Sequence, residues 1–188
     1  MRIRDRYDAD VPTVVGPVSR RRPVFVDDVF FDEVRDWGAN TLERAAAGLS
    51  CKTAVHICYG HGIEANIKWK QGLGAEWRQY EQTFPLLAAS RIDQVSLECR
   101  NSHVPIELIG LLGGKEVMVG AIDVATNRVE TPEEVAATLR KALQWVRPHR
   151  LIGCTHCGMV PLPRAVARGK LHALAAGAAI LRAELGWT

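Results

Sequence analysis

Short apolar runs alternate along this chain with longer segments of helical periodicity, and this alternation most constrains the fold. Strands are expected at residues 53–58, 94–98, 116–122 and 151–152. The run Val117-Met118-Val119 is continuously apolar, as in a strand whose two faces are both buried in a parallel sheet. Because parallel strands need crossover connections, usually helical, βα units in series predict an α/β fold.

Helices are expected between these strands, and several carry clear end signals. The segments with helical patterns cover residues 33–49, 75–89, 105–112, 131–145 and 163–185. Thr131-Pro132-Glu133-Glu134 has the composition of a capping box, and Gly113-Gly114 is typical of a helix C-terminus. Pro85 lies inside the second segment and should end or kink it. In the irregular N-terminal segment, residues 11–18 and 23–26 are further strand candidates.

Composition describes an ordinary globular domain and excludes several classes of function. The 188 residues are 47% hydrophobic and 24% charged, and the net charge of +3 is too small to favour nucleic acid. No apolar stretch approaches the roughly 20 residues that span a bilayer, and the N-terminus lacks the apolar region of a secretory signal. We therefore expect a cytoplasmic protein without nucleic-acid or membrane partners. It should form one domain over residues 1–188, with an irregular lead at 1–32 that carries remnant strands, and βα units at 33–188.

Candidate metal ligands sit at the ends of three expected strands. His56 and Cys58 are two positions apart in one strand, so their side chains should point to the same face. Glu98 ends a second strand, and Cys157 follows a third. Imidazole and thiolate together are ligands typical of zinc. Cys154 competes with Cys157, because Cys154-x-x-Cys157 has the spacing of a zinc knuckle.

The same candidates bear on how the sheet is closed. All lie at the carboxyl ends of strands, where both barrels and open doubly wound sheets place active sites. Convergence from three strands favours a (β/α)8 TIM barrel, yet a complete barrel needs about 250 residues. The chain therefore predicts a shortened or partial barrel with about five to six parallel strands. Its open sheet edges should lead it to associate with another copy or a partner, as a possible homo-oligomer. Two nearby histidines, His61 and His156, are interpreted as solvated loop residues.

Three motifs, in order along the chain, resemble the cobalamin-independent methionine synthase family. They are His56-Ile57-Cys58-Tyr59, Ser96-Leu97-Glu98 and Cys157-Gly158. The resemblance covers about Pro12 to Gly186, and it is closest to the short relatives that lack the family's extra N-terminal barrel. It implies the family's TIM-barrel fold.

The resemblance also implies roles for individual residues. One zinc ion would be held by His56, Cys58, Glu98 and Cys157. Gly158 follows Cys157 as in the family, which favours Cys157 over Cys154. Glu98 and Asp123 would be catalytic, and Asp27 would contact the amino-acid substrate.

The activity implied by the resemblance is that of a zinc-dependent 5-methyltetrahydropteroyltriglutamate–homocysteine methyltransferase. Such an enzyme moves a methyl group to the thiol of homocysteine and forms methionine. Only a thiolate attacks, and an ordinary thiol has a pKa near ~8.5, so zinc serves to remove the proton. Two alternatives stay open: alkyl transfer to another small thiol, and a zinc-binding paralogue that is catalytically degenerate.

The chain departs from the family pattern in two places. Full methionine synthases carry a histidine two residues after the aspartate that matches Asp123, and here that position is Ala125. The methyl donor, a folate or a methylcobalamin carrier, is therefore left open. The lead is also short, because Thr13-Val14-Val15-Gly16-Pro17-Val18 and Phe25-Val26-Asp27-Asp28 match early family strands without the segment that normally separates them.

Overall fold

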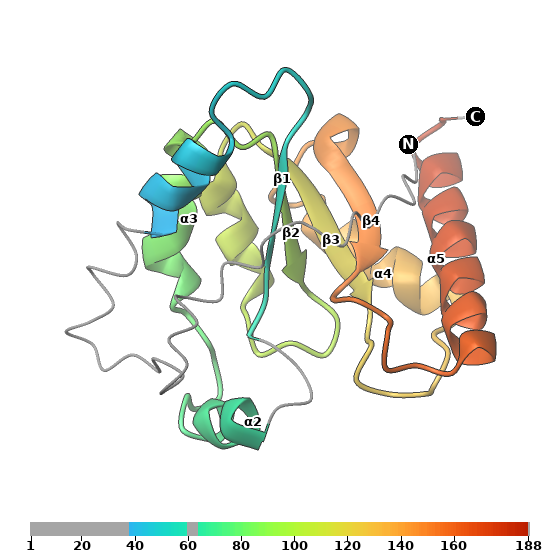
Figure 1. Ribbon diagram of the computed structural model, residues 1–188. Coiled ribbons are helices and arrows are strands. Elements are labelled where there is room, and N and C mark those ends of the chain that lie inside the picture. The colour runs from blue at the N-terminus through green and yellow to red at the C-terminus, as the bar shows by residue number, and fades with distance from the viewer. Residues whose placement is uncertain (1–37, 60–63, 188) are drawn as a thin grey trace.

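The computed structural model describes residues 38–59 and 64–187, and a parallel β-sheet lies at the centre of this part of the chain (Figure 1). Its four strands are neighbours in chain order, and all three pairings are parallel. They are β1 (Ala54–Ile57), β2 (Gln94–Glu98), β3 (Glu116–Ile122) and β4 (Leu151–Thr155). The predicted α/β fold is confirmed, and β2 and β3 have the predicted bounds.

Helical segments connect and follow the strands (Figure 1). They are α2 (Glu64–Gln71), α3 (Tyr80–Ala89), the 3-10 helix η1 (Ile106–Leu112), α4 (Pro132–Ala142), the 3-10 helix η2 (Pro148–Arg150) and α5 (Arg164–Glu184), with a further helical stretch at residues 38–45. The predicted capping box starts α4, because Thr131 Oγ1 accepts from the Glu134 N–H and the Glu134 carboxylate accepts from the Thr131 N–H.

Several helices differ from their predicted form. Residues 106–112 form a 3-10 helix, and Gly110 in its middle lowers α-helix propensity. α3 begins only at Tyr80 and runs through Pro85, because buried Phe84 and Leu87 anchor it on both sides of the proline. α4 ends at Ala142 rather than near residue 145, and α2 was not predicted. The strand candidates at 11–18 and 23–26 lie outside the described residues.

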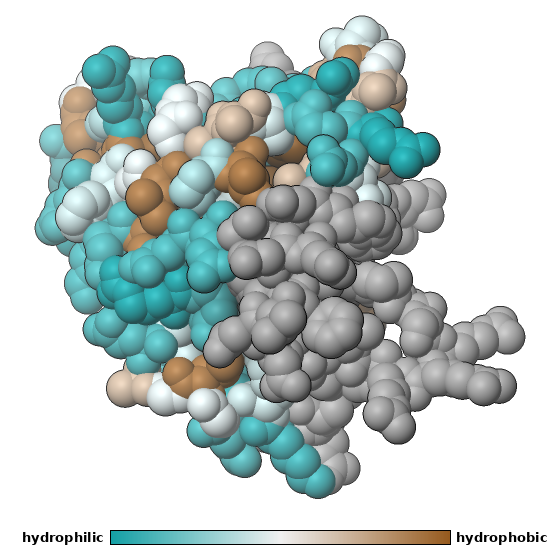
Figure 2. Space-filling view, turned by 90° about the vertical axis from the view of Figure 1, so that its left-hand side faces the viewer, coloured by the Kyte–Doolittle hydropathy of each residue, from teal (hydrophilic) through white to brown (hydrophobic). Residues whose placement is uncertain are grey.

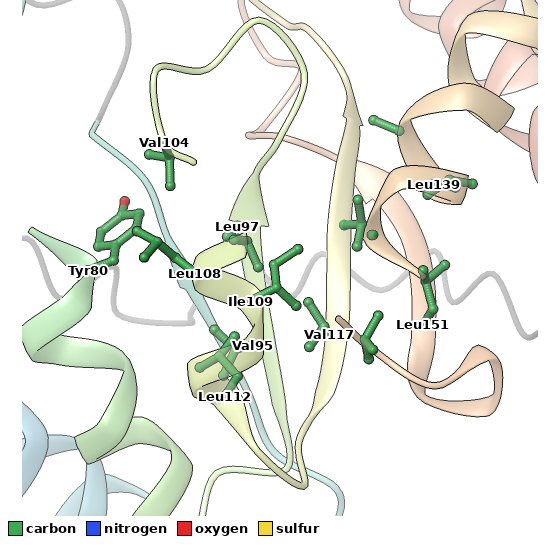
Figure 3. Close-up of a cluster of buried hydrophobic side chains, with 14 of the residues drawn as sticks. Tyr80, Val95, Leu97, Val104, Leu108, Ile109, Leu112, Val117, Leu139 and Leu151 are labelled. Atoms are coloured by element: carbon green, nitrogen blue, oxygen red, sulfur yellow. The ribbon is translucent and has the colours of Figure 1, made fainter. Parts of the chain in front are cut away.

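Alternate residues of the central strands form the core with the helices. Val95, Leu97 and Val117 are each at most 1% exposed. η1 contributes Ile109 and α4 contributes Leu139 to the same cluster (Figure 3). Because side chains alternate along a strand, the intervening residues point to the opposite face of the sheet.

That opposite face carries polar side chains toward the carboxyl ends of the strands. The register pairs His56 with Ser96, and it places Gly120 between Glu98 on β2 and Cys154 on β4. In a (β/α)8 barrel, the face away from the helices lines the interior. The sheet therefore has the layout of a partial barrel.

The outer surface mixes hydrophilic and hydrophobic residues. On the face shown in Figure 2, hydrophobic residues form several small groups separated by hydrophilic ones. Large hydrophobic side chains that are exposed come from several elements: Leu49, Leu111, Val129, Trp145, Val160, Leu171 and Trp187. Among the described helices, none combines the length and the hydrophobicity needed to cross a membrane.

Gly120 is a position at which we expect any side chain to disrupt the sheet. A Cβ atom there would lie 2.5 Å from His156 Cα and 2.6 Å from the Leu97 carbonyl oxygen. Because backbone atoms cannot swing aside, Gly120→Ala should lower the free energy of unfolding by about 1–3 kcal/mol, measured by urea denaturation. Gly113→Ala is the matched control, since a Cβ there meets nothing within 4 Å. Equal stability of the two variants would contradict this packing.

The edges of the sheet lead to a prediction about association. Within the described residues, β1 and β4 each pair with a neighbouring strand on one side only. Unpaired strand edges are templates for another chain, so we expect the protein to bind a second copy. Analytical ultracentrifugation over a concentration series should show a species heavier than the 20.7 kDa chain. A well-folded monomer throughout the micromolar range would count against this expectation.

Candidate metal centre

Residues at the ends of β1 and β4 meet at the carboxyl edge of the sheet. His56 lies in β1, Cys58 follows that strand directly, and Cys157 lies just beyond the end of β4. A ring nitrogen of His56 and the two sulfur atoms all lie within 4.8 Å of one another. Parallel strands bring their carboxyl ends to one edge, so residues a hundred positions apart in sequence become neighbours here.

The spacing of these atoms suits a tetrahedral zinc ion. Two sulfur atoms that each lie about 2.3 Å from one zinc ion are about 3.8 Å apart in that geometry. The Sγ atoms of Cys58 and Cys157 are 3.9 Å apart. His56 Nδ1 lies 3.0 Å from Ser96 Oγ, whereas His56 Nε2 is buried and has no hydrogen-bond partner in the described part of the chain. A buried nitrogen without a partner is costly, and a metal ion at this point would satisfy it.

The two cysteines that compete in the sequence have opposite electrostatic environments. The hydrogen bond from the Cys58 thiol, assisted by the His56 ring, lowers the pKa of Cys157 to about 4. Burial raises the pKa of Cys154 to about 12, against a smaller effect of Ser96. Cys157 therefore favours the thiolate that binds metal, while Cys154 stays a neutral thiol and lies outside the three-residue cluster.

Glu98, the predicted fourth ligand, lies beside this cluster rather than within it. It ends β2 and is 4% exposed, and it is not among the three residues whose ligand atoms lie within 4.8 Å. The last pair of the β1–β2 register is Ile57 with Leu97, so Cys58 and Glu98 are the residues that directly follow this pair in the sequence. Glu98 Oε1 accepts a hydrogen bond of 3.1 Å from the Tyr59 N–H. Its role as a metal ligand stays a prediction.

An aromatic cluster that the sequence did not reveal fixes the residue after Cys58. The ring centroid of Tyr59 lies 4.7 Å from that of Trp77 and 5.0 Å from that of Tyr80. The Tyr59 hydroxyl donates to Gln79 Oε1 at 2.7 Å, and burial followed by the Glu98 charge raises the Tyr59 pKa. Trp77 and Tyr80 are at helical spacing, but Tyr59 lies on a different segment, so no local pattern predicts the cluster. It holds the Tyr59 N–H in place for Glu98.

Asp123 follows β3 and is held by three hydrogen bonds. It accepts from Asn101 Nδ2 at 2.9 Å, from the Ala125 N–H at 2.8 Å and from His156 Nε2 at 3.1 Å. Burial raises the Asp123 pKa, but the hydrogen bonds and the His156 ring outweigh it and leave the pKa below its usual value. His156 Nδ1 accepts from the Val124 N–H at 3.1 Å. His156 is 2% exposed, so its interpretation as a solvated loop residue was wrong, because both ring nitrogens serve to tie two strand ends together.

A buried ion pair beneath Asp123 also escaped the sequence analysis. Lys170 of α5 and Glu130 are 0% and 1% exposed at their side chains, and Lys170 Nζ lies 3.0 Å from Glu130 Oε2. Glu130 Oε1 accepts a hydrogen bond of 2.9 Å from the Asp123 N–H. Lys170 stands at helical spacing before buried Leu174 and Ala178, a signal that could have placed it on the buried face. The pair fixes the loop that carries Asp123.

Two residues considered in the sequence cannot be placed. Asp27, the predicted substrate-binding residue, lies outside the described residues. His61 falls in the undescribed segment between residues 59 and 64.

Known proteins are similar to this chain in sequence. Residues 30–179 match the family described as "Cobalamin-independent synthase, Catalytic domain". The chain is 32% identical over 151 residues to a methionine synthase of Saccharolobus islandicus (strain Y.G.57.14 / Yellowstone #1), which covers 79% of this chain and 40% of that protein. A methionine synthase of Sulfurisphaera tokodaii is 30% identical over 151 residues, covering 80% of this chain and 39% of that protein.

A solved structure gives the same assignment. It is a B12-independent methionine synthase from Shewanella sp. W3-18-1 in complex with selenomethionine, with 66% sequence identity and a TM-score of 0.78. The match covers 84% of this chain and 46% of that one. The chain thus spans less than half the length of these relatives, and over that span it belongs to the cobalamin-independent methionine synthase family.

Proposed function

We propose that this chain carries the thiol-activating site of a zinc-dependent methyltransferase that forms methionine from homocysteine. The observation that carries the proposal is the cluster of His56, Cys58 and Cys157, whose ligand atoms lie within 4.8 Å of one another. Relatives named methionine synthase support the reaction class. Zinc is the metal that this mixture of imidazole and thiolate suits best.

Four residues would hold the metal. They are His56 through Nε2, Cys58 and Cys157 as thiolates, and Glu98 through a carboxylate oxygen. A bound zinc ion would lower the pKa of a coordinated thiol, so that a thiolate is available near neutral pH. The chain's own contribution begins at Cys157, where neighbouring groups lower the pKa to about 4 and so favour the deprotonated ligand.

The acidic residues of the site are positioned by the backbone of neighbouring loops. The Tyr59 N–H donates to Glu98 Oε1 and so fixes the carboxylate at the end of β2. Asp123 stays ionised because Asn101 and Ala125 donate hydrogen bonds to it. We propose that Glu98 completes the metal site and that Asp123 orders the mouth of the barrel next to it.

The substrates follow from this assignment. The acceptor would be homocysteine or a similar small thiol, and the donor a folate or a methylcobalamin carrier. Ala125 has no proton to give, so a donor whose leaving group must be protonated would need another acid.

Zinc content tests the choice of ligands. Cys157→Ser should abolish zinc retention, because it removes one of three clustered ligand atoms and replaces a thiolate by a hydroxyl. Cys154→Ser is the matched control and should keep one zinc ion per chain, since Cys154 lies outside the cluster. Plasma mass spectrometry after gel filtration would measure the metal.

Other outcomes separate the competing functions. The reverse result would show that Cys154 is the ligand. A wild-type chain without zinc would overturn every zinc-dependent function. Zinc retention without methionine formation from either donor would favour a catalytically degenerate paralogue. Transfer to a thiol other than homocysteine, and not to homocysteine, would favour an enzyme that alkylates another small thiol.

A further inference from the structure

Ser96 connects the metal centre to the cysteine that lies outside it. Ser96 Oγ lies 3.0 Å from His56 Nδ1 and 3.7 Å from Cys154 Sγ. The serine is 8% exposed and pairs with His56 in the β1–β2 register. Side chains from β1, β2 and β4 therefore form one line of polar contacts across the sheet.

Gly120 lies on the strand between Ser96 and Cys154. β3 lies between β2 and β4, and its Gly120 pairs with Glu98 on one side and Cys154 on the other. Because glycine has no side chain, nothing from this position separates Ser96 from Cys154.

The contacts accommodate the arrangement of protons on His56 that metal binding through Nε2 requires. A serine hydroxyl accepts as well as donates, so Ser96 Oγ can accept from a protonated Nδ1 while it interacts with the Cys154 thiol. With the proton on Nδ1, the lone pair lies on Nε2, the buried nitrogen that has no hydrogen-bond partner in the described region.

We propose that Ser96 is a positioning residue for the metal centre: its hydroxyl, contacted by Cys154, fixes the His56 ring so that Nε2 is presented to the metal. This inference rests on the proposed zinc function. A second residue that binds the other ring nitrogen sets the tautomer and orientation of a metal-ligating histidine, and its loss typically weakens metal binding about 10–100-fold. The alternative is a serine that only satisfies its own hydroxyl in the interior of the sheet.

Zinc affinity of the full chain, measured by competition with a chromophoric chelator, distinguishes these roles. Ser96→Ala should weaken zinc binding about 10–100-fold, and Ser96→Thr, which retains the hydroxyl, should restore most of it. Ser90→Ala is the matched control. It also removes a hydroxyl that is hydrogen-bonded, here to the Leu87 carbonyl, but Ser90 precedes the amino end of β2, whereas the metal cluster lies at the carboxyl edge of the sheet. Thermal melting of each variant identifies any that fails to fold.

Nitrogen NMR of the His56 ring supplies a readout that a merely structural serine would not move. The zinc-loaded wild type should show a protonated Nδ1 and a metal-bound Nε2. In the apo chain, the wild type should keep the single tautomer with the proton on Nδ1, and Ser96→Ala should lose it. Should Ser96→Ala fail to fold, Cys154→Ala tests the same line of contacts and should weaken zinc binding less than tenfold but measurably.

Two results would overturn the inference in different ways. Wild-type zinc affinity and an unchanged His56 tautomer in folded Ser96→Ala would reject the role of Ser96 and leave the proposed function standing. A wild-type chain that binds no zinc would reject the proposed function, and this inference with it.

Discussion

Backbone hydrogen bonds hold the four strands in parallel register, and this register decides which side chains meet at the carboxyl edge of the sheet. It pairs His56 with Ser96, and Glu98 directly follows the last residue of β2 that pairs with β1. It also brings Cys157, which follows β4, to a point where its Sγ lies within 4.8 Å of a ring nitrogen of His56 and of Cys58 Sγ. A slip of one residue in any pairing would turn the polar positions toward the apolar core. The chemistry of the site therefore depends on how the sheet is packed.

Packing also explains why two cysteines three residues apart have different environments. Cys154 lies in β4, surrounded by the sheet, and burial keeps its thiol neutral. Cys157 lies beyond the strand, beside Cys58 and His56, and these neighbours stabilise its thiolate. Sequence spacing alone treats the pair as equivalent zinc ligands. The difference arises where the strand ends and the loop turns toward β1.

Strands could be predicted from the sequence because continuous apolar runs and turn signals are local. The bounds of β2 and β3 followed from such runs, and the convergence of His56, Cys58 and Cys157 followed from the rule that parallel strands end at one edge. Loop paths could not be predicted. Helical spacing could have placed Lys170 on the buried face of α5. Its pairing with Glu130 and the burial of His156 depend on contacts between segments far apart in the chain, which no local period encodes.

The central claim is that this edge of the sheet activates a substrate thiol through zinc. X-ray absorption at the zinc edge, with and without homocysteine, tests it most directly. The account predicts a zinc shell with two sulfur ligands that gains a third zinc–sulfur bond when homocysteine is added. Zinc whose sulfur coordination does not change with homocysteine would contradict the claim.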